Sequence, residues 1–185
     1  AFKQIFTPYI AASLPVFVTS DTVLSGYHVL MEESVLRLEQ VNAARLPVML
    51  AFIWKNLQAV DKDVKGKPKL VAAAKARAQV VIATALRLLG EEPAGLSPKL
   101  APLVDAEVKR VTVASGTAKP EWLGPPDRGF MALDYTRYRP RGFYTGSEGL
   151  RRYFRAVSWL QSIPFRVEKD EELLAMLMLG NALRY

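Results

Sequence analysis

Arginine and tyrosine are concentrated between positions 134 and 159, in the run DYTRYRPRGFYTGSEGLRRYFRAVSW. Three arginines stand at every second position of this run: Arg137, Arg139 and Arg141. On an extended backbone this spacing places all three guanidinium groups on one side. Guanidinium groups form forked hydrogen bonds with carboxylates and phosphates, and tyrosine rings offer flat surfaces for stacking. The run therefore indicates either a site for an anionic or glycan-like ligand or a buried ionic keystone.

The positive charge of the chain is local. The net charge is +7, from 25 basic and 18 acidic residues. Between positions 120 and 166 there are eight arginines and four acidic residues, an excess of four positive charges. This distribution favours an anionic partner at one site over nucleic acid. The candidate ligand-binding residues are Asp134, Arg137, Arg139, Arg141, Tyr144, Arg151, Arg155, Asp21 and His28.

A second polar stripe consists of Asp21, Ser25, His28 and Glu32, which recur at helical spacing. The last two stand four residues apart, a spacing at which one metal ion could be shared. The chain has one histidine and no cysteine. A structural role is therefore favoured, and we expect neither a metal at His28 nor a cofactor.

Two alternatives to a binding module stay open. In the first, Asp134 pairs with Asp21, Glu32 or Glu148 in a glycan-active hydrolase, which needs two carboxylates at working distance. In the second, Asp134 and Glu148 neutralise the arginines, and the motif is a structural keystone. We expect Asp134 to be buried and bonded to an arginine or to backbone amides, and we favour no enzymatic activity.

The elements that position these residues are predicted to be helices. Apolar residues recur at helical spacing between short proline or glycine breaks, and no convincing strand alternates. We expect an all-α fold of six or seven helices in antiparallel hairpins. Such hairpins could form part of an α/α toroid or a helical array. The expected helices cover residues 2–12, 22–45, 47–59, 70–89, about 97–116, 147–162 and 173–183.

Several local signals set the expected boundaries. Pro47 should break the long second helix, and residues 15–18 should be an extended entry into it. Thr145 and Glu148 have the spacing of a capping box. Residues 117–133 are rich in proline and glycine, and this irregular stretch should be anchored by Trp122 and Phe130.

The length of 185 residues suits a single helical domain covering 1–185. No apolar run is long enough to span a bilayer, and the first residues lack the pattern of a signal peptide. The final segment LLAMLMLGNALRY is apolar without a polar stop. We therefore expect a further protein chain, or the rest of a longer domain, to pack on the open ends.

Two motifs resemble one known family. PVFVTSDTVLSGYHVLMEE is similar to PVFVTSDSVLHAYH, and DYTRYRPRGFYTGSEGLRRYFRAVSWL is similar to DYSQFKPRGHYTRSEELKRYFRAMMWL. Both are typical of the prokaryotic domain of unknown function 3160. The resemblance implies a helical, envelope-associated protein in the periplasm or outside the cell, of which this chain is the amino-terminal part. Ser25 and Phe143 stand where that family commonly has histidine, and no reaction is implied.

Overall fold

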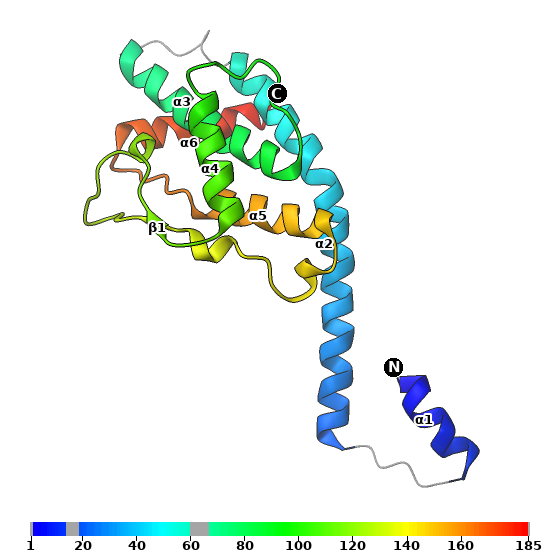
Figure 1. The fold of residues 1–185 in the computed structure, drawn as a ribbon. Coiled ribbons are helices and arrows are strands. Elements are labelled where there is room, and N and C mark those ends of the chain that lie inside the picture. Colours follow the sequence, from blue (N-terminus) through cyan, green and yellow to red (C-terminus); the bar gives the residue numbers. More distant parts are fainter. Residues whose placement is uncertain (1, 14–18, 60–66, 185) are drawn as a thin grey trace. The chain divides into compact units, whose positions relative to one another are not determined.

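The computed structural model describes residues 2–13, 19–59 and 67–184, and these form a mostly helical fold (Figure 1). Within these ranges the α-helices are α1 (Phe2–Ala11), α2 (Ser20–Ala59), α3 (Pro68–Leu89), α4 (Ala101–Val113), α5 (Glu148–Ser162) and α6 (Asp170–Ala182). The predicted all-α class with six or seven helices is confirmed. Residues 15–18, which we expected to be extended, lie outside the described part.

The chain divides into two units, Ala1–Val41 and Asn42–Tyr185, each described here by itself. In the first unit, Thr19 caps α2 by accepting a hydrogen bond from the Thr22 amide at 3.2 Å. The apolar side chains of this part of α2 are exposed, including Val23, Tyr27 and Leu30. Even so, none of the helices in the described ranges combines the length and apolarity needed to cross a membrane.

Helix α2 does not break at Pro47, and the predicted boundary there is wrong. Proline lacks the amide hydrogen that a helix interior uses, so an uninterrupted helix needs stabilisation from packing. Leu46 and Leu50 are buried on either side of the proline, and Trp54 is buried one turn further on. The Trp54 indole also donates a hydrogen bond to the Ala94 carbonyl at 2.8 Å. Burial on both sides of Pro47 therefore holds the helix together.

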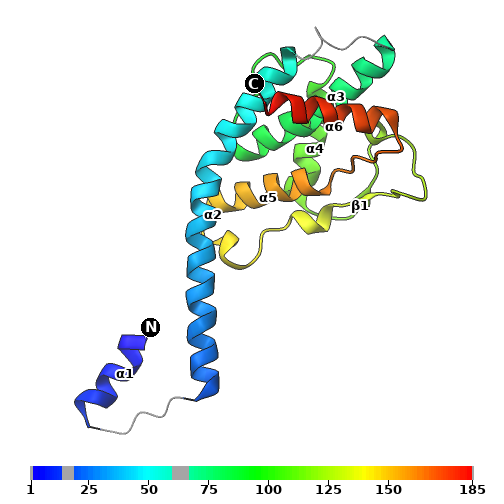
Figure 2. The ribbon, with the colours of Figure 1, turned by 180° about the vertical axis from the view of Figure 1, so that it is seen from behind.

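Helix α3 is the centre of the second unit and packs against α4, α5 and α6. Its buried alanines, among them Ala74, Ala78 and Ala85, let neighbouring helices approach closely. Helix α4 lies nearer the viewer in Figure 1 and α6 in Figure 2, so the two cover different sides of α3. Gly90 ends the helix in a left-handed conformation with φ 92°, as the sequence predicted.

Helix α5 buries Leu150, Tyr153, Ala156 and Trp159, a row with a spacing of three residues. The Trp159 indole donates to the Val81 carbonyl of α3 at 3.0 Å. Phe154, on another side of the helix, is only half-buried. The buried face is therefore turned away from Phe154, and that turn leaves one side of α5 available for a site.

A buried carboxylate joins α4 to the segments that follow it. Glu107 is fully buried, and its two oxygens accept hydrogen bonds from three side chains. The donors are Arg110 at 2.5 Å, the Trp122 indole at 3.2 Å and the Tyr135 hydroxyl at 2.6 Å. Burial raises the pKa of the Tyr135 hydroxyl, and the bond to Glu107 raises it further. We call these four residues the Glu107 centre.

The irregular stretch between α4 and α5 is closed by a two-stranded pair. Strand β1 (Thr117–Ala118) runs antiparallel to β2 (Leu133–Asp134), with Thr117 opposite Asp134. A short 3₁₀ helix, η2 (Glu121–Leu123), lies between the strands and carries Trp122. Trp122 and Phe130 are both half-buried and pack on the core, so their predicted anchoring role is confirmed.

A second ionic cluster ties this stretch to α6. The Arg166 guanidinium donates to Glu172 at 2.5 Å and 2.9 Å and to Asp127 at 2.7 Å and 2.9 Å. Burial alone would raise the pKa of Asp127, but the Arg166 bonds and the amides of Phe130 and Gly129 lower it to about 2. Burial likewise opposes ionisation of Glu172, and the bonds from Arg166 lower its pKa below the ordinary value.

Glu107→Ala should lower the free energy of unfolding by about 3–5 kcal/mol, because the buried Tyr135 and Trp122 donors lose their acceptor. Urea unfolding measures this. Tyr135→Phe removes one hydroxyl and should cost about 1–2 kcal/mol. The matched control is Asp105→Ala, which removes an exposed carboxylate of the same helix that pairs with Arg87 and should cost under about 1 kcal/mol. Equal losses for Glu107→Ala and Asp105→Ala would contradict the role of the Glu107 centre.

Acid should weaken the second cluster. Asp127 and Glu172 have lower pKa values in the folded chain than in the unfolded chain, so the unfolded chain binds protons first as pH falls. Their contribution to stability is therefore full above about pH 5 and is lost as the pH falls toward 2. Asp127→Asn should be less stable at pH 7 and lose less stability on acidification. Urea midpoints across this pH range measure both effects, and parallel pH curves for variant and wild type would refute the cluster's contribution.

Candidate functional site

The arginine motif begins in a 3₁₀ helix, η3 (Tyr135–Tyr138), and not in an extended backbone. The extended backbone that would place the three arginines on one side is therefore not present at Arg137. A 3₁₀ helix has three residues per turn, so Tyr135 and Tyr138 lie on the same side, and both are buried. The Tyr135 amide also donates to the Gly116 carbonyl at 3.0 Å. Because Tyr135 and Tyr138 are buried on one side of η3, Arg137 is exposed on another side.

Tyr138 connects η3 to α5. Its hydroxyl oxygen lies 2.5 Å from the Ser162 hydroxyl oxygen. Ser162 donates its own hydrogen to the Trp159 carbonyl at 3.0 Å, so Tyr138 is the donor to Ser162. Burial raises the pKa of Tyr138 to about 12, which keeps this donor protonated at neutral pH. The motif is thereby fixed against the last turn of α5.

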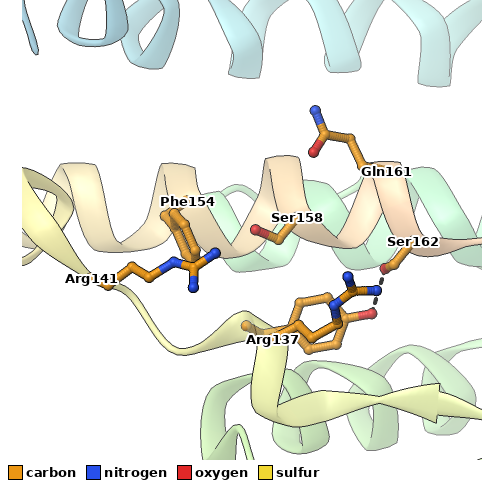
Figure 3. A pocket seen from close by; sticks show the side chains of 7 residues that line it. Arg137, Arg141, Phe154, Ser158, Gln161 and Ser162 are labelled. Carbon is orange, nitrogen blue, oxygen red and sulfur yellow. Dashed lines mark hydrogen bonds between the residues drawn. The ribbon is translucent and has the colours of Figure 1, made fainter. Parts of the chain in front are cut away.

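A cavity of about 350 Å³ lies between the motif and α5 (Figure 3). Its volume is at the lower end of the range of about 300–1,000 Å³ that small-molecule sites occupy. Figure 3 shows two arginines that come from the motif, while the remaining labelled side chains come from α5. The lining residues are Arg137, Tyr138, Arg141, Phe154, Ser158, Gln161 and Ser162.

The cavity is positively charged, because two of its lining residues are arginines and none is acidic. Arg137 and Arg141 are both exposed. Neither forms an ion pair or a side-chain hydrogen bond with any residue in the part of the chain that the structure describes. Their five guanidinium N–H donors each remain available for an anion such as a phosphate or carboxylate.

Asp134 is exposed, so the prediction of a buried carboxylate is wrong. The predicted bond to a backbone amide is confirmed, because Oδ1 accepts from the Thr136 amide at 3.0 Å. The Thr136 hydroxyl donates to the same oxygen at 2.6 Å. These two bonds, together with the nearby charge of Arg137, lower the pKa of Asp134. Asp134 acts as the cap of η3, since a short polar side chain at this position can satisfy a free amide.

Glu148 pairs with arginines outside the cavity. Arg151 and Arg152 donate to its two carboxylate oxygens at 2.9 Å and 3.3 Å, and the Arg151 bond is the main reason that its pKa is lowered. The predicted capping box is wrong, because Ser147, and not Thr145, accepts the bond from the Leu150 amide at 3.2 Å. Thr145 instead belongs to the 3₁₀ helix η4 (Gly142–Thr145) that precedes α5. Neither Asp134 nor Glu148 lines the cavity.

The other predicted site residues do not line this cavity either. Arg139 is exposed, and Tyr144 packs with its ring centroid 4.9 Å from that of Phe154. Arg155 is half-buried, and its Nε atom has no hydrogen-bond partner among the described residues. Asp21 and His28 belong to the other unit. His28 is exposed, with Nε2 3.9 Å from a Glu32 carboxylate oxygen.

Sequence reasoning selected Arg151 and Arg155 of α5 but missed the residues of this helix that line the cavity. Phe154, Ser158 and Ser162 recur at intervals of four residues, so they share one helix face with Gln161 nearby. The recurrence of small polar residues on a helix that is otherwise apolar and basic was the available signal. Elsewhere in the described ranges, no three histidine, aspartate or glutamate side chains gather in a group that could hold a metal ion.

Comparison with known proteins identifies the family. A family model described as a protein of unknown function (DUF3160) matches residues 1–184. The chain therefore belongs to this family, as its two motifs indicated. No curated protein and no solved structure matches the chain. The expected envelope location, single-domain organisation and packing partner stay predictions.

Asp134→Ala should lower the melting temperature only slightly, and by less than Glu107→Ala, because the side chain is exposed and caps one turn. Asp134→Asn keeps an oxygen that can accept the hydrogen bond from the Thr136 amide, so this variant should melt like the wild type. Thermal unfolding followed by circular dichroism gives the melting temperatures of Asp134→Ala, Asp134→Asn, Glu107→Ala and the wild type. A loss from Asp134→Ala as large as that from Glu107→Ala would show that Asp134 is a keystone after all.

Proposed function

We propose that this protein binds an anionic small molecule in the cavity between η3 and α5. The observation that carries the proposal is a pair of arginines, Arg137 and Arg141, that line one cavity without an acidic partner. Other arginines of the described residues have carboxylate partners, as Arg166 has in Asp127 and Glu172. The described residues provide no such partner to Arg137 and Arg141.

The same geometry supports binding over glycan hydrolysis. A retaining or inverting glycosidase needs two carboxyl groups that flank the scissile bond. No acidic residue lines the cavity, and the two carboxylates nearest in sequence, Asp134 and Glu148, already accept hydrogen bonds elsewhere. A ligand held here would be oriented by guanidinium groups and by α5, with no carboxylate of the cavity in reach to act as acid or base.

The proposal predicts that inorganic phosphate binds through Arg137 and Arg141. Arg137→Gln and Arg141→Gln should each weaken binding about tenfold or more, because charge-assisted hydrogen bonds contribute about 1.5–3 kcal/mol. Arg139→Gln is the matched control, since Arg139 stands between them in sequence and does not line the cavity. It should leave binding nearly unchanged.

The measurement is a phosphate titration followed by the ¹⁵N resonances of the arginine Nε atoms, with sodium chloride at matched ionic strength as the blank. Such shifts report even weak binding, with dissociation constants of roughly 1 mM or above. The Nε resonances of Arg137 and Arg141 should shift and saturate together. Shifts that chloride reproduces, or that are as large at Arg139, would overturn the proposal.

A further inference from the structure

The cavity has two chemically different parts. Arg137 and Arg141 supply its charge, whereas the side chains from α5 are uncharged. Ser158 is half-buried and Gln161 is exposed, and the side chains of both are without hydrogen-bond partners in the described ranges. Figure 3 places Ser158 between the end formed by Arg141 and Phe154 and the end formed by Arg137, Gln161 and Ser162. A ligand that uses the whole cavity must therefore combine an anionic group with neutral hydrogen-bonding groups.

Phe154 adds an apolar wall to the neutral part. Its ring is half-buried and packs against Tyr144, at a centroid distance of 4.9 Å. A sugar ring presents C–H groups on its face and hydroxyl groups around its rim. The face can pack on an aromatic ring while the hydroxyls meet groups that both donate and accept, as the Ser158 hydroxyl and the Gln161 amide do.

The charge of the cavity selects the anion. Two guanidinium groups contribute two positive charges, and the described residues that line the cavity include no acidic one. A phosphate monoester carries about −1.5 to −2 charges at pH 7 and has three acceptor oxygens, which can accept hydrogen bonds from more than one guanidinium group. A single sugar carboxylate carries one negative charge and can be matched by one guanidinium. The phosphate monoester is the better complement.

We propose that the ligand is a phosphorylated sugar, with its phosphate on Arg137 and Arg141 and its ring between Phe154, Ser158 and Gln161. This inference rests on the proposed anion site and adds the chemistry of the second half of the cavity. The volume of about 350 Å³ suits one sugar ring with its phosphate, and not a polymer.

Isothermal titration calorimetry with glucose 6-phosphate, inorganic phosphate, glucose, glucuronate and AMP tests the inference. Glucose 6-phosphate should bind at least about tenfold more tightly than inorganic phosphate, because the ring adds contacts of its own. Glucose should bind too weakly to measure. Glucuronate and AMP should both bind more weakly than glucose 6-phosphate.

Variants on α5 separate the two halves of the cavity. Gln161→Ala and Phe154→Leu should each reduce the advantage of glucose 6-phosphate over phosphate, while the affinity for phosphate itself stays unchanged. Gln161 is exposed, so its replacement should not disturb folding. Phe143→Leu is the matched control, because Phe143 is a half-buried aromatic residue that does not line the cavity.

The outcomes distinguish this inference from the proposal beneath it. Equal affinities for glucose 6-phosphate and phosphate would overturn the sugar assignment and leave the anion site standing. Tighter binding of AMP or glucuronate would also overturn the sugar-phosphate assignment in favour of another anion. If glucose binds and inorganic phosphate does not, or if no probe binds at all, both the anion site and the sugar-phosphate assignment are overturned.

Discussion

The carboxylate of Glu107 lies inside the chain and accepts hydrogen bonds from side chains of three consecutive segments. A buried charge is tolerated only when it is paired and hydrogen-bonded, so its donors must be kept in place. Arg110 comes from the same helix, Trp122 from the irregular stretch and Tyr135 from the start of the arginine motif. This one group therefore fixes where the chain can run after α4.

The position of the cavity follows from that constraint. Once Tyr135 is bound to Glu107, the three-residue turn of η3 brings Tyr138 to the same side, where it donates to Ser162 of α5. The residue between the two tyrosine anchors on the outer side is Arg137. Since Asp134 is engaged by Thr136 and Glu148 by Arg151, the acidic groups of the motif are occupied. The exposed guanidinium groups are left beside a helix face that carries small polar side chains and one aromatic ring.

Much of the helical framework could be predicted from spacing and composition. The alanine-rich run before Gly90 specified α3 and its end, because alanine favours helix and glycine accepts a left-handed cap. Pro47 gave a wrong helix boundary, because the burial of leucines on both sides outweighs the loss of its amide hydrogen bond. The spacing of two residues between Arg137, Arg139 and Arg141 also gave a wrong prediction, an extended backbone. Such a spacing predicts an extended chain only when no other contact fixes the backbone. Here the buried tyrosines fix a 3₁₀ turn.

The Glu107 centre and the α5 half of the cavity depend on contacts between distant residues. Glu107 is separated from Tyr135 by 28 positions, and nothing in the local pattern of α4 distinguishes it from an exposed helical glutamate. Ser158 recurs with Phe154 and Ser162 on one helix face, but this recurrence indicates a site only once the motif is folded against it. The arginines could be selected as candidates from the sequence because charge and residue type are local properties, whereas their partners and the cavity are properties of the packing.

What Arg137 and Arg141 bind can be observed directly in a crystal structure of the chain grown with glucose 6-phosphate. We expect the phosphate group to bridge Arg137 and Arg141 and the sugar ring to lie against Phe154. Guanidinium groups of Arg137 and Arg141 that are bound to carboxylates of the chain itself, with no ligand between them, would contradict it.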